Sequence, residues 1–106
     1  MDIQLRRGML EVCVLKLLQK KPSYGYQLSR DLPAFLQITE STLYPILRRL
    51  ETANLLKVHS VEHNGRLRKY YQINEAGEAR IAQFIQEWTA VMQIYNYIAE
   101  GDSTHE

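Results

Sequence analysis

Residues 56–73 read LKVHSVEHNGRLRKYYQI, a run in which polar and apolar side chains alternate on both sides of Asn64-Gly65. Alternation with a period of two is typical of a half-buried β-strand. Asparagine and glycine both tolerate positive φ, so this pair between two alternating runs is a strong hairpin signal. We therefore predict strands over residues 56–61 and 66–73, joined by a turn at residues 62–65.

The second predicted strand has two unlike faces. One face is basic and aromatic, and the other is mostly apolar. The first carries Arg66, Arg68 and Tyr70, and the second carries Leu67, Tyr71 and Ile73. A hairpin of this kind can place one face on a protein core and offer the other to a polyanion.

Three helices are predicted ahead of the hairpin. The first, residues 5–18, is apolar nearly all round, so it is either the central helix of the domain or a helix that also meets a partner chain. The second, residues 24–32, has Ser23 as its candidate N-cap and ends at Pro33. The third runs from an N-cap at Thr39 to about Asn54. Three short helices with a tight middle connection predict a helix-turn-helix.

Pro45 falls near the second turn of the third helix, where its missing N–H removes one backbone hydrogen bond. Three outcomes are open from the sequence: a late helix start, a bend, or compensation by a side chain.

A long helix is predicted after the hairpin, over residues 75–100, with Asn74 as its cap and Gly101 as its stop. Its apolar residues follow a 4-3 spacing over a rod of about 37 Å, which is too long for the preceding body to cover. Pairing with a second chain is the expected solution, and packing within one chain is the alternative. The predicted dimerisation residues are Ile81, Phe84, Ile85, Trp88, Val91, Met92, Tyr95 and Ile98.

The chain is expected to divide into a winged helix-turn-helix domain (1–74), a dimerisation helix (75–100) and a disordered tail (101–106). The fold class is mainly α with a small β-hairpin. Residues 1–74 carry twelve basic and six acidic side chains, a net +6, and residues 75–106 carry one and six, a net −5. This split indicates that the first part alone faces a polyanion, although a chance division of surface charge is the alternative.

The single cysteine, Cys13, excludes an intramolecular disulfide and fits a reducing compartment, so a cytoplasmic protein is expected. Its apolar neighbours favour a buried structural thiol over a reactive one. No apolar run has the length of a membrane span, and no secretory signal sequence is recognisable.

Helix, helix, helix and basic hairpin is the plan of a winged helix-turn-helix, in which the third helix enters the major groove and the hairpin lies along the adjacent backbone. Any one polar residue of the third helix can instead belong to an ordinary solvated face. The predicted DNA-contacting side chains are Tyr24, Ser41, Thr42, Tyr44, Arg48, Arg49, Arg66, Arg68 and Lys69.

Residues 9–77 resemble the PadR family of bacterial transcriptional regulators. The resemblance is carried by Tyr24-Gly25-Tyr26, by STLYP (41–45) followed by LRRLE (47–51), and by RKYYQINEAG (68–77). The single C-terminal helix resembles the compact subgroup of that family. Two small departures, Asn54 for a common glycine and Asn74 for a usual threonine, leave the expected fold unchanged.

The resemblance implies repression by an obligate homodimer on a two-fold-symmetric operator. In the compact subgroup, some members also bind flat aromatic compounds between the two C-terminal helices, stacked on tryptophan. Trp88 is at the corresponding position, with Ile85 and Met92 one turn away on either side. The alternative role for Trp88 is simply to fill the dimer core.

An enzyme is not expected, and neither is a cofactor or a metal. His59, His63 and His105 have no metal-ligand spacing with Cys13, and no phosphate-binding loop or nucleophile motif is present. Two competing hypotheses stay open: a winged-helix protein-interaction module without its own operator, and a ligand sensor without one. The basic hairpin argues against the first, because counterion release from DNA requires such cations.

Overall fold

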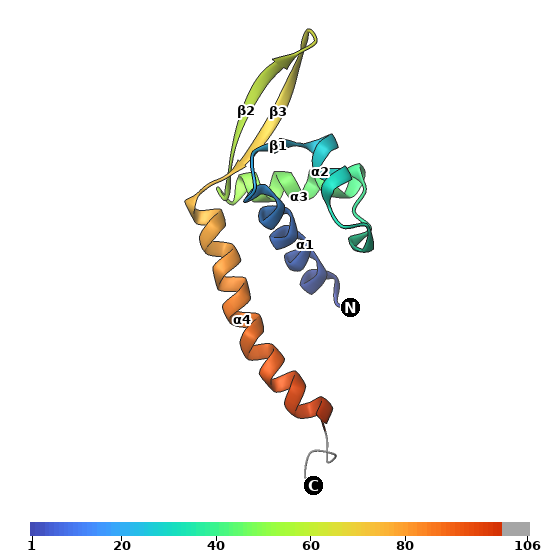
Figure 1. Ribbon diagram of the computed structural model, residues 1–106, viewed down its shortest axis with the longest axis vertical. Helices are drawn as coiled ribbons and strands as arrows, with labels where there is room; N and C mark the ends of the chain where they lie inside the picture. The colour runs from blue at the N-terminus through green and yellow to red at the C-terminus, as the bar shows by residue number, and fades with distance from the viewer. Residues whose placement is uncertain (101–106) are drawn as a thin grey trace.

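The computed structural model describes residues 1–100 and shows the predicted order of three helices, a hairpin and a long helix (Figure 1). The expected tail, 101–106, lies outside the described residues. The helices are α1 (Ile3–Leu18), α2 (Gly25–Asp31), the 3-10 turn η1 (Ala34–Leu36), α3 (Glu40–Thr52) and α4 (Glu75–Glu100), and the strands are β1 (Ser23–Tyr24), β2 (Leu56–His63) and β3 (Arg66–Ile73).

The core is built around α1, which packs against α2, α3, α4 and β3. Val14 and Leu15 of α1 are fully buried, as are Leu28 of α2 and Leu43 of α3. Of the two alternatives for this helix, the structure shows the central helix of the domain, and contact of α1 with a partner chain stays a prediction. Its apolar character on several sides follows from having a neighbour on several sides.

The sheet has the strand order β1-β3-β2 and is antiparallel throughout. The turn at Asn64-Gly65 is confirmed, with φ 52° and φ 79°, but it is shorter than predicted, because Glu62 and His63 pair with β3 as the last residues of β2. The strand β1 was not predicted, because two residues are too few to show a period. The predicted N-cap role of Ser23 is wrong: Ser23 pairs with Tyr71 in the sheet, and the residue before α2 is Tyr24, which makes no side-chain cap bond.

The helix α3 begins at Glu40 and continues through Pro45, so the late start is excluded. Thr39 is the N-cap residue, but its hydroxyl lies 3.0 Å from the hydroxyl of Ser41 and 3.2 Å from that of Thr42 instead of bonding the backbone. The other end closes as expected for an asparagine that tolerates positive φ: Asn54 has φ 63°.

The junction between the hairpin and α4 is tightly fixed. The carboxamide of Asn74 accepts a hydrogen bond from the N–H of Gly77 at 2.8 Å and donates one to the carbonyl of Asn54 at 2.9 Å, which confirms the predicted cap. A Cβ at Gly77 would lie 2.6 Å from the carbonyl oxygen of Leu55 and from the side chain of Ile73. The first turn of α4 is therefore held against the base of the wing, β2 and β3.

The rest of α4 projects away from the body (Figure 1), and the molecule measures 68 × 26 × 23 Å. Packing against α1 covers only the first part of the helix, where Ile81 is buried.

Candidate nucleic-acid interface

The exposed face of α3 carries the polar residues that were predicted to meet DNA. Leu43, Ile46, Leu47 and Leu50 are buried, so the helix turns its other side to solvent. That side presents Ser41, Tyr44 and Arg48, spaced three and four residues apart, and all three are exposed.

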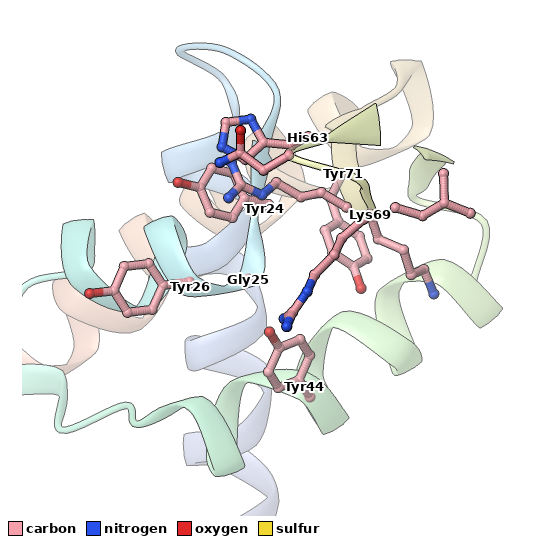
Figure 2. Close-up of a pocket in the computed structure, with 11 residues that line it drawn as sticks. Tyr24, Gly25, Tyr26, Tyr44, His63, Lys69 and Tyr71 are labelled. Carbon is pink, nitrogen blue, oxygen red and sulfur yellow. The ribbon is translucent and has the colours of Figure 1, made fainter. Parts of the chain in front are cut away.

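A concave notch of about 650 Å³ separates this face from the wing (Figure 2). Its walls come from the N-terminal part of α3, the start of α2 and the wing. The residues that line it are Tyr24, Gly25, Tyr26, Tyr44, His63, Asn64, Arg66, Leu67, Arg68, Lys69 and Tyr71. Five of the nine predicted DNA contacts, Tyr24, Tyr44, Arg66, Arg68 and Lys69, are thus brought to one site.

An aromatic row crosses the sheet beside this notch. The guanidinium of Arg68 lies 4.0 Å from the centre of the Tyr24 ring, a cation–π contact. Tyr24 in turn packs edge-on against Tyr70 with the ring centres 5.3 Å apart, and Tyr70 stacks with His59 at 5.9 Å. The row joins all three strands and ties the wing to the start of α2.

This aromatic row was not predicted, although two of its members, Tyr70 and His59, lie on the two strands of the predicted hairpin. Tyr24, Tyr70 and His59 face each other only because the register pairs Tyr70 with both of the others. Tyr70 and His59 belong to the predicted hairpin, but Tyr24 joins them through a strand that the sequence did not reveal.

Two tyrosine hydroxyls point into the notch from opposite walls, Tyr44 from α3 and Tyr71 from β3 (Figure 2). Burial raises the pKa of Tyr44, and Glu40 and Tyr71 raise it further. Burial also raises the pKa of Tyr71, with Glu51 acting in the same direction and Arg48 opposing it. Both hydroxyls therefore stay protonated at neutral pH and can donate hydrogen bonds to an anion.

Arg48 and Arg49 are neighbours in sequence but point to different surroundings. Arg48 is exposed on the solvent face of α3. The Nε of Arg49 donates to the Oε2 of Glu11 at 2.6 Å, and the two side chains are 37% and 19% exposed. Arg49 thus links α3 to α1, a distinction that helical spacing alone did not make.

The predicted dimerisation residues divide into two groups. Ile81 is buried within its own chain, and Phe84 and Trp88 are half-buried with ring centres 5.9 Å apart. The remaining five are exposed: Ile85, Val91, Met92, Tyr95 and Ile98. Ile94 and Tyr97, which lie off the predicted stripe, are exposed too, at 63% and 78%. The last turns of α4 are therefore apolar on most sides.

An apolar groove of about 510 Å³ lies beside this helix, between α1, η1 and the start of α4. Its walls include Cys13 and Leu17 of α1, Phe35 of η1 and Ile85 of α4. Cys13, which was predicted to be buried, is half-buried because one side of it faces this groove, and its partial burial raises the pKa of the thiol. This groove was not predicted, because its walls come from segments far apart in the chain.

Across residues 1–100 no three histidine, cysteine or acidic side chains gather in a way that could hold a metal ion. In the same range no helix combines the length and the hydropathy of a membrane span.

Comparison with known families gives a match over most of the folded body. The model of the transcriptional regulator PadR-like family matches residues 14–83. A Lysinibacillus sphaericus protein known as "Uncharacterized protein X" is 33% identical over 100 residues, which cover 90% of this chain and 92% of that protein.

Solved structures agree along nearly the whole chain. A PadR family transcriptional regulator from Eggerthella lenta is 33% identical with a TM-score of 0.80, covering 93% of this chain and 88% of the other. A PadR-like regulator from Bacillus cereus is 32% identical with a TM-score of 0.76, covering 92% and 98%. A Streptococcus mutans protein is 37% identical with a TM-score of 0.76, covering 94% of each.

Proposed function

The chain belongs to the PadR-like family of transcriptional regulators, and we propose that it represses transcription as a homodimer bound to a two-fold-symmetric DNA operator. Its family and its structural neighbours are regulators and not enzymes. The observation that carries the proposal is the notch between α3 and the wing, where basic and hydroxyl-bearing side chains converge beside the exposed face of a helix.

The notch suits a DNA backbone that passes between α3 and the wing. Lys69 and Arg66 are exposed, and the stacked Arg68 presents a guanidinium whose position is already fixed. A side chain that is held before binding loses less conformational entropy when it contacts a phosphate. Ser41, Thr42 and Tyr44 at the start of α3 are then placed to read base edges.

The case for a homodimer rests on apolar surface that one chain leaves uncovered. Met92 and Tyr95 are 45% and 57% exposed on the projecting part of α4. The groove between α1 and η1 is a complementary apolar surface on the body of the molecule. A second copy of the chain offers both surfaces at once, so a two-fold arrangement can cover the helix of each protomer. The two recognition helices are expected to lie about 34 Å apart, one turn of DNA.

Release by a planar aromatic ligand is proposed at Trp88. The indole is half-buried against Phe84, and Ile85 and Met92 are exposed on either side of it. Two such indoles across a two-fold interface would form a slot for a flat ring. A ligand that binds there changes the spacing of the recognition helices only if it favours one helix arrangement over another. The alternative is that Trp88 serves dimer packing alone.

The test begins with an operator selected by the wild-type protein from a pool of random duplexes. Arg68→Ala and Lys69→Ala should weaken binding to operator and unrelated DNA alike, and should lower the slope of log affinity against log salt by about one unit per lost phosphate contact. Thr42→Ala and Tyr44→Ala should weaken operator binding more than binding to unrelated DNA.

Lys21→Ala is the matched control, because Lys21 is an exposed cation in the connection after α1 and does not line the notch. Unchanged salt slopes in the wing variants would show that the hairpin is not a phosphate clamp. Absence of any salt-dependent binding by the wild type would favour the protein-interaction alternative.

A further inference from the structure

A second group of arginines lies on the side of α3 that faces away from the wing. The helix divides its exposed residues between two concave surfaces: Tyr44 lines the notch with the wing, whereas Thr42, Pro45 and Arg49 line a groove of about 310 Å³ with α1. Figure 1 shows the hairpin and the N-terminal end of α1 on opposite sides of α3. Arg6 and Arg7 of α1 line the second groove.

Two of these three arginines are held in place. The Nη2 of Arg6 donates to the carbonyl oxygen of Leu36 at 2.8 Å, and the Nε of Arg49 donates to Glu11 at 2.6 Å. A guanidinium has five N–H donors, so each keeps several for another partner. Arg6 and Arg7 are exposed, and the side chain of Arg49 is 37% exposed.

The acidic groups nearby do not cancel this charge. Asp2 caps α1 by accepting a hydrogen bond from the N–H of Leu5 at 3.0 Å. Glu11 is only 19% exposed and faces Arg49. The groove itself has apolar walls from Met1, Ile3 and Leu10. Arg6, Arg7 and Arg49 outnumber Asp2 and Glu11 by one, and only Glu11 forms an ion pair with one of the three arginines, so this flank keeps a net positive charge.

The shape of duplex DNA indicates which of its parts would meet this surface. The major groove is about 12 Å wide, and a helix that lies in it has a sugar-phosphate strand on each side. If the wing follows one strand, the other strand runs along the opposite flank of α3. That flank is where Arg6, Arg7 and Arg49 are.

We propose that Arg6, Arg7 and Arg49 contact backbone phosphates of the DNA strand on the side of α3 away from the wing, with Glu11 as the positioning residue for Arg49. This rests on the DNA binding proposed above. It adds a second set of phosphate contacts to those proposed for the wing, so that DNA strands on both sides of each α3 helix are bound. The wing then supplies only part of the salt dependence of binding.

Arg7→Ala is the first test, because Arg7 is exposed and the ion pair between Arg49 and Glu11 stays intact. The salt slope should fall by about one unit and affinity by about fivefold for operator and unrelated DNA alike. The loss should add to that of Arg68→Ala, because the two residues contact different strands. Lys21→Ala again serves as the control.

A map of individual phosphates gives the sharper readout. On the selected operator, each phosphate is replaced in turn by a neutral methylphosphonate. Substitution at one set of phosphates should weaken binding by the wild type but not binding by Arg7→Ala. Substitution at a set on the other side of the groove should weaken binding by the wild type but not binding by Arg68→Ala. Glu11→Gln keeps the size of the side chain, and it should reduce the penalty at the Arg49 phosphate without changing the penalties assigned to Arg68.

Two results overturn the proposal. If Arg7→Ala leaves the slope and every methylphosphonate penalty unchanged while Arg68→Ala alters them, the α1 flank does not touch DNA, although DNA binding itself stands. If the wild type shows no salt-dependent binding, both proposals fail together.

Discussion

The ring of Tyr44 lies directly against the backbone of Gly25, in the space that a side chain at residue 25 would occupy. A Cβ there would be 2.6 Å from two ring carbons of Tyr44 and closer still to its hydroxyl oxygen. The glycine at the start of α2 therefore sets the position of a side chain on α3. The Tyr-Gly-Tyr and Thr-Leu-Tyr-Pro segments of the sequence meet at this contact.

Gly25→Ala should displace the Tyr44 ring and weaken operator binding, with a loss of about 1–3 kcal/mol in stability from the clash. The salt slope should stay near the wild-type value, because no phosphate-binding cation has moved. Chemical denaturation and a binding titration on operator DNA measure the two effects. In a Tyr44→Ala background the same substitution should cost much less, since the clashing ring is gone. Equal costs in both backgrounds would contradict this account.

The sequence predicted the parts of the fold that depend on local pattern. The period of two around Asn64-Gly65 gave the hairpin, and the cap at Asn74 gave the start of α4, because both signals lie within a few residues of the chain. The strand β1 escaped prediction because it exists only by pairing with Tyr70 and Tyr71, far along the chain. The same cause misassigned Ser23, whose residue type suits a cap as well as a strand.

The sequence allowed most residues of the candidate site to be predicted, but not how they are arranged in space. Arg48 and Arg49 both lie off the apolar stripe of α3, and only the packing of α1 shows that Arg49 meets Glu11. Likewise, the apolar stripe on α4 does not reveal at which residue the packing of α1 against α4 ends. The structure places that limit after Ile81, with Phe84 and Trp88 partly covered.

Ile85→Asp with Met92→Asp should yield monomers, because each substitution puts a charge into an apolar interface without a partner for it. Ile85 and Met92 are 59% and 45% exposed in the single chain, so the damage should fall mainly on assembly. Size-exclusion chromatography with light scattering reports the mass directly. The control is Gln86→Asp, an exposed position of α4 off the stripe. A monomeric wild type at micromolar concentration would remove the dimer from the proposal.

Titration with neutral planar aromatic dyes should quench the fluorescence of Trp88 saturably, because stacking places the ring against the indole. Trp88 is the single tryptophan, so the signal has one source. Neutral dyes are chosen because the stripe residues on either side of Trp88, Ile85 and Met92, carry no charge to pair with an ion. Trp88→Phe keeps an aromatic ring as a control for folding. If a broad dye panel leaves emission unchanged, Trp88 has only a packing role.

Alkylation of Cys13 should be slow at neutral pH and should rise only at higher pH than for a free thiol, because burial raises its pKa and the thiolate is the reacting form. A pH series with iodoacetamide measures the inflection. In Met92→Asp, whose new charge lies outside the walls of the groove, the rate at a fixed pH should increase if a partner helix covers the groove in the wild type. Identical rates in the two proteins would show that the groove is open in both.

Because the projecting part of α4 is uncovered in a single chain, the resistance of the protein to proteolysis should depend on its concentration. Over its last turns the helix has Ile94, Tyr97 and Ile98 in water, and a helical segment of that length without packing partners is marginal. A chain that finds no partner therefore spends more time with frayed, apolar ends within reach of proteases. Pairing removes those states by mass action, so thermal stability should rise with protein concentration. In the homodimer proposed above, dilution raises the share of single, protease-sensitive chains, so the proposed repression should weaken at low copy number.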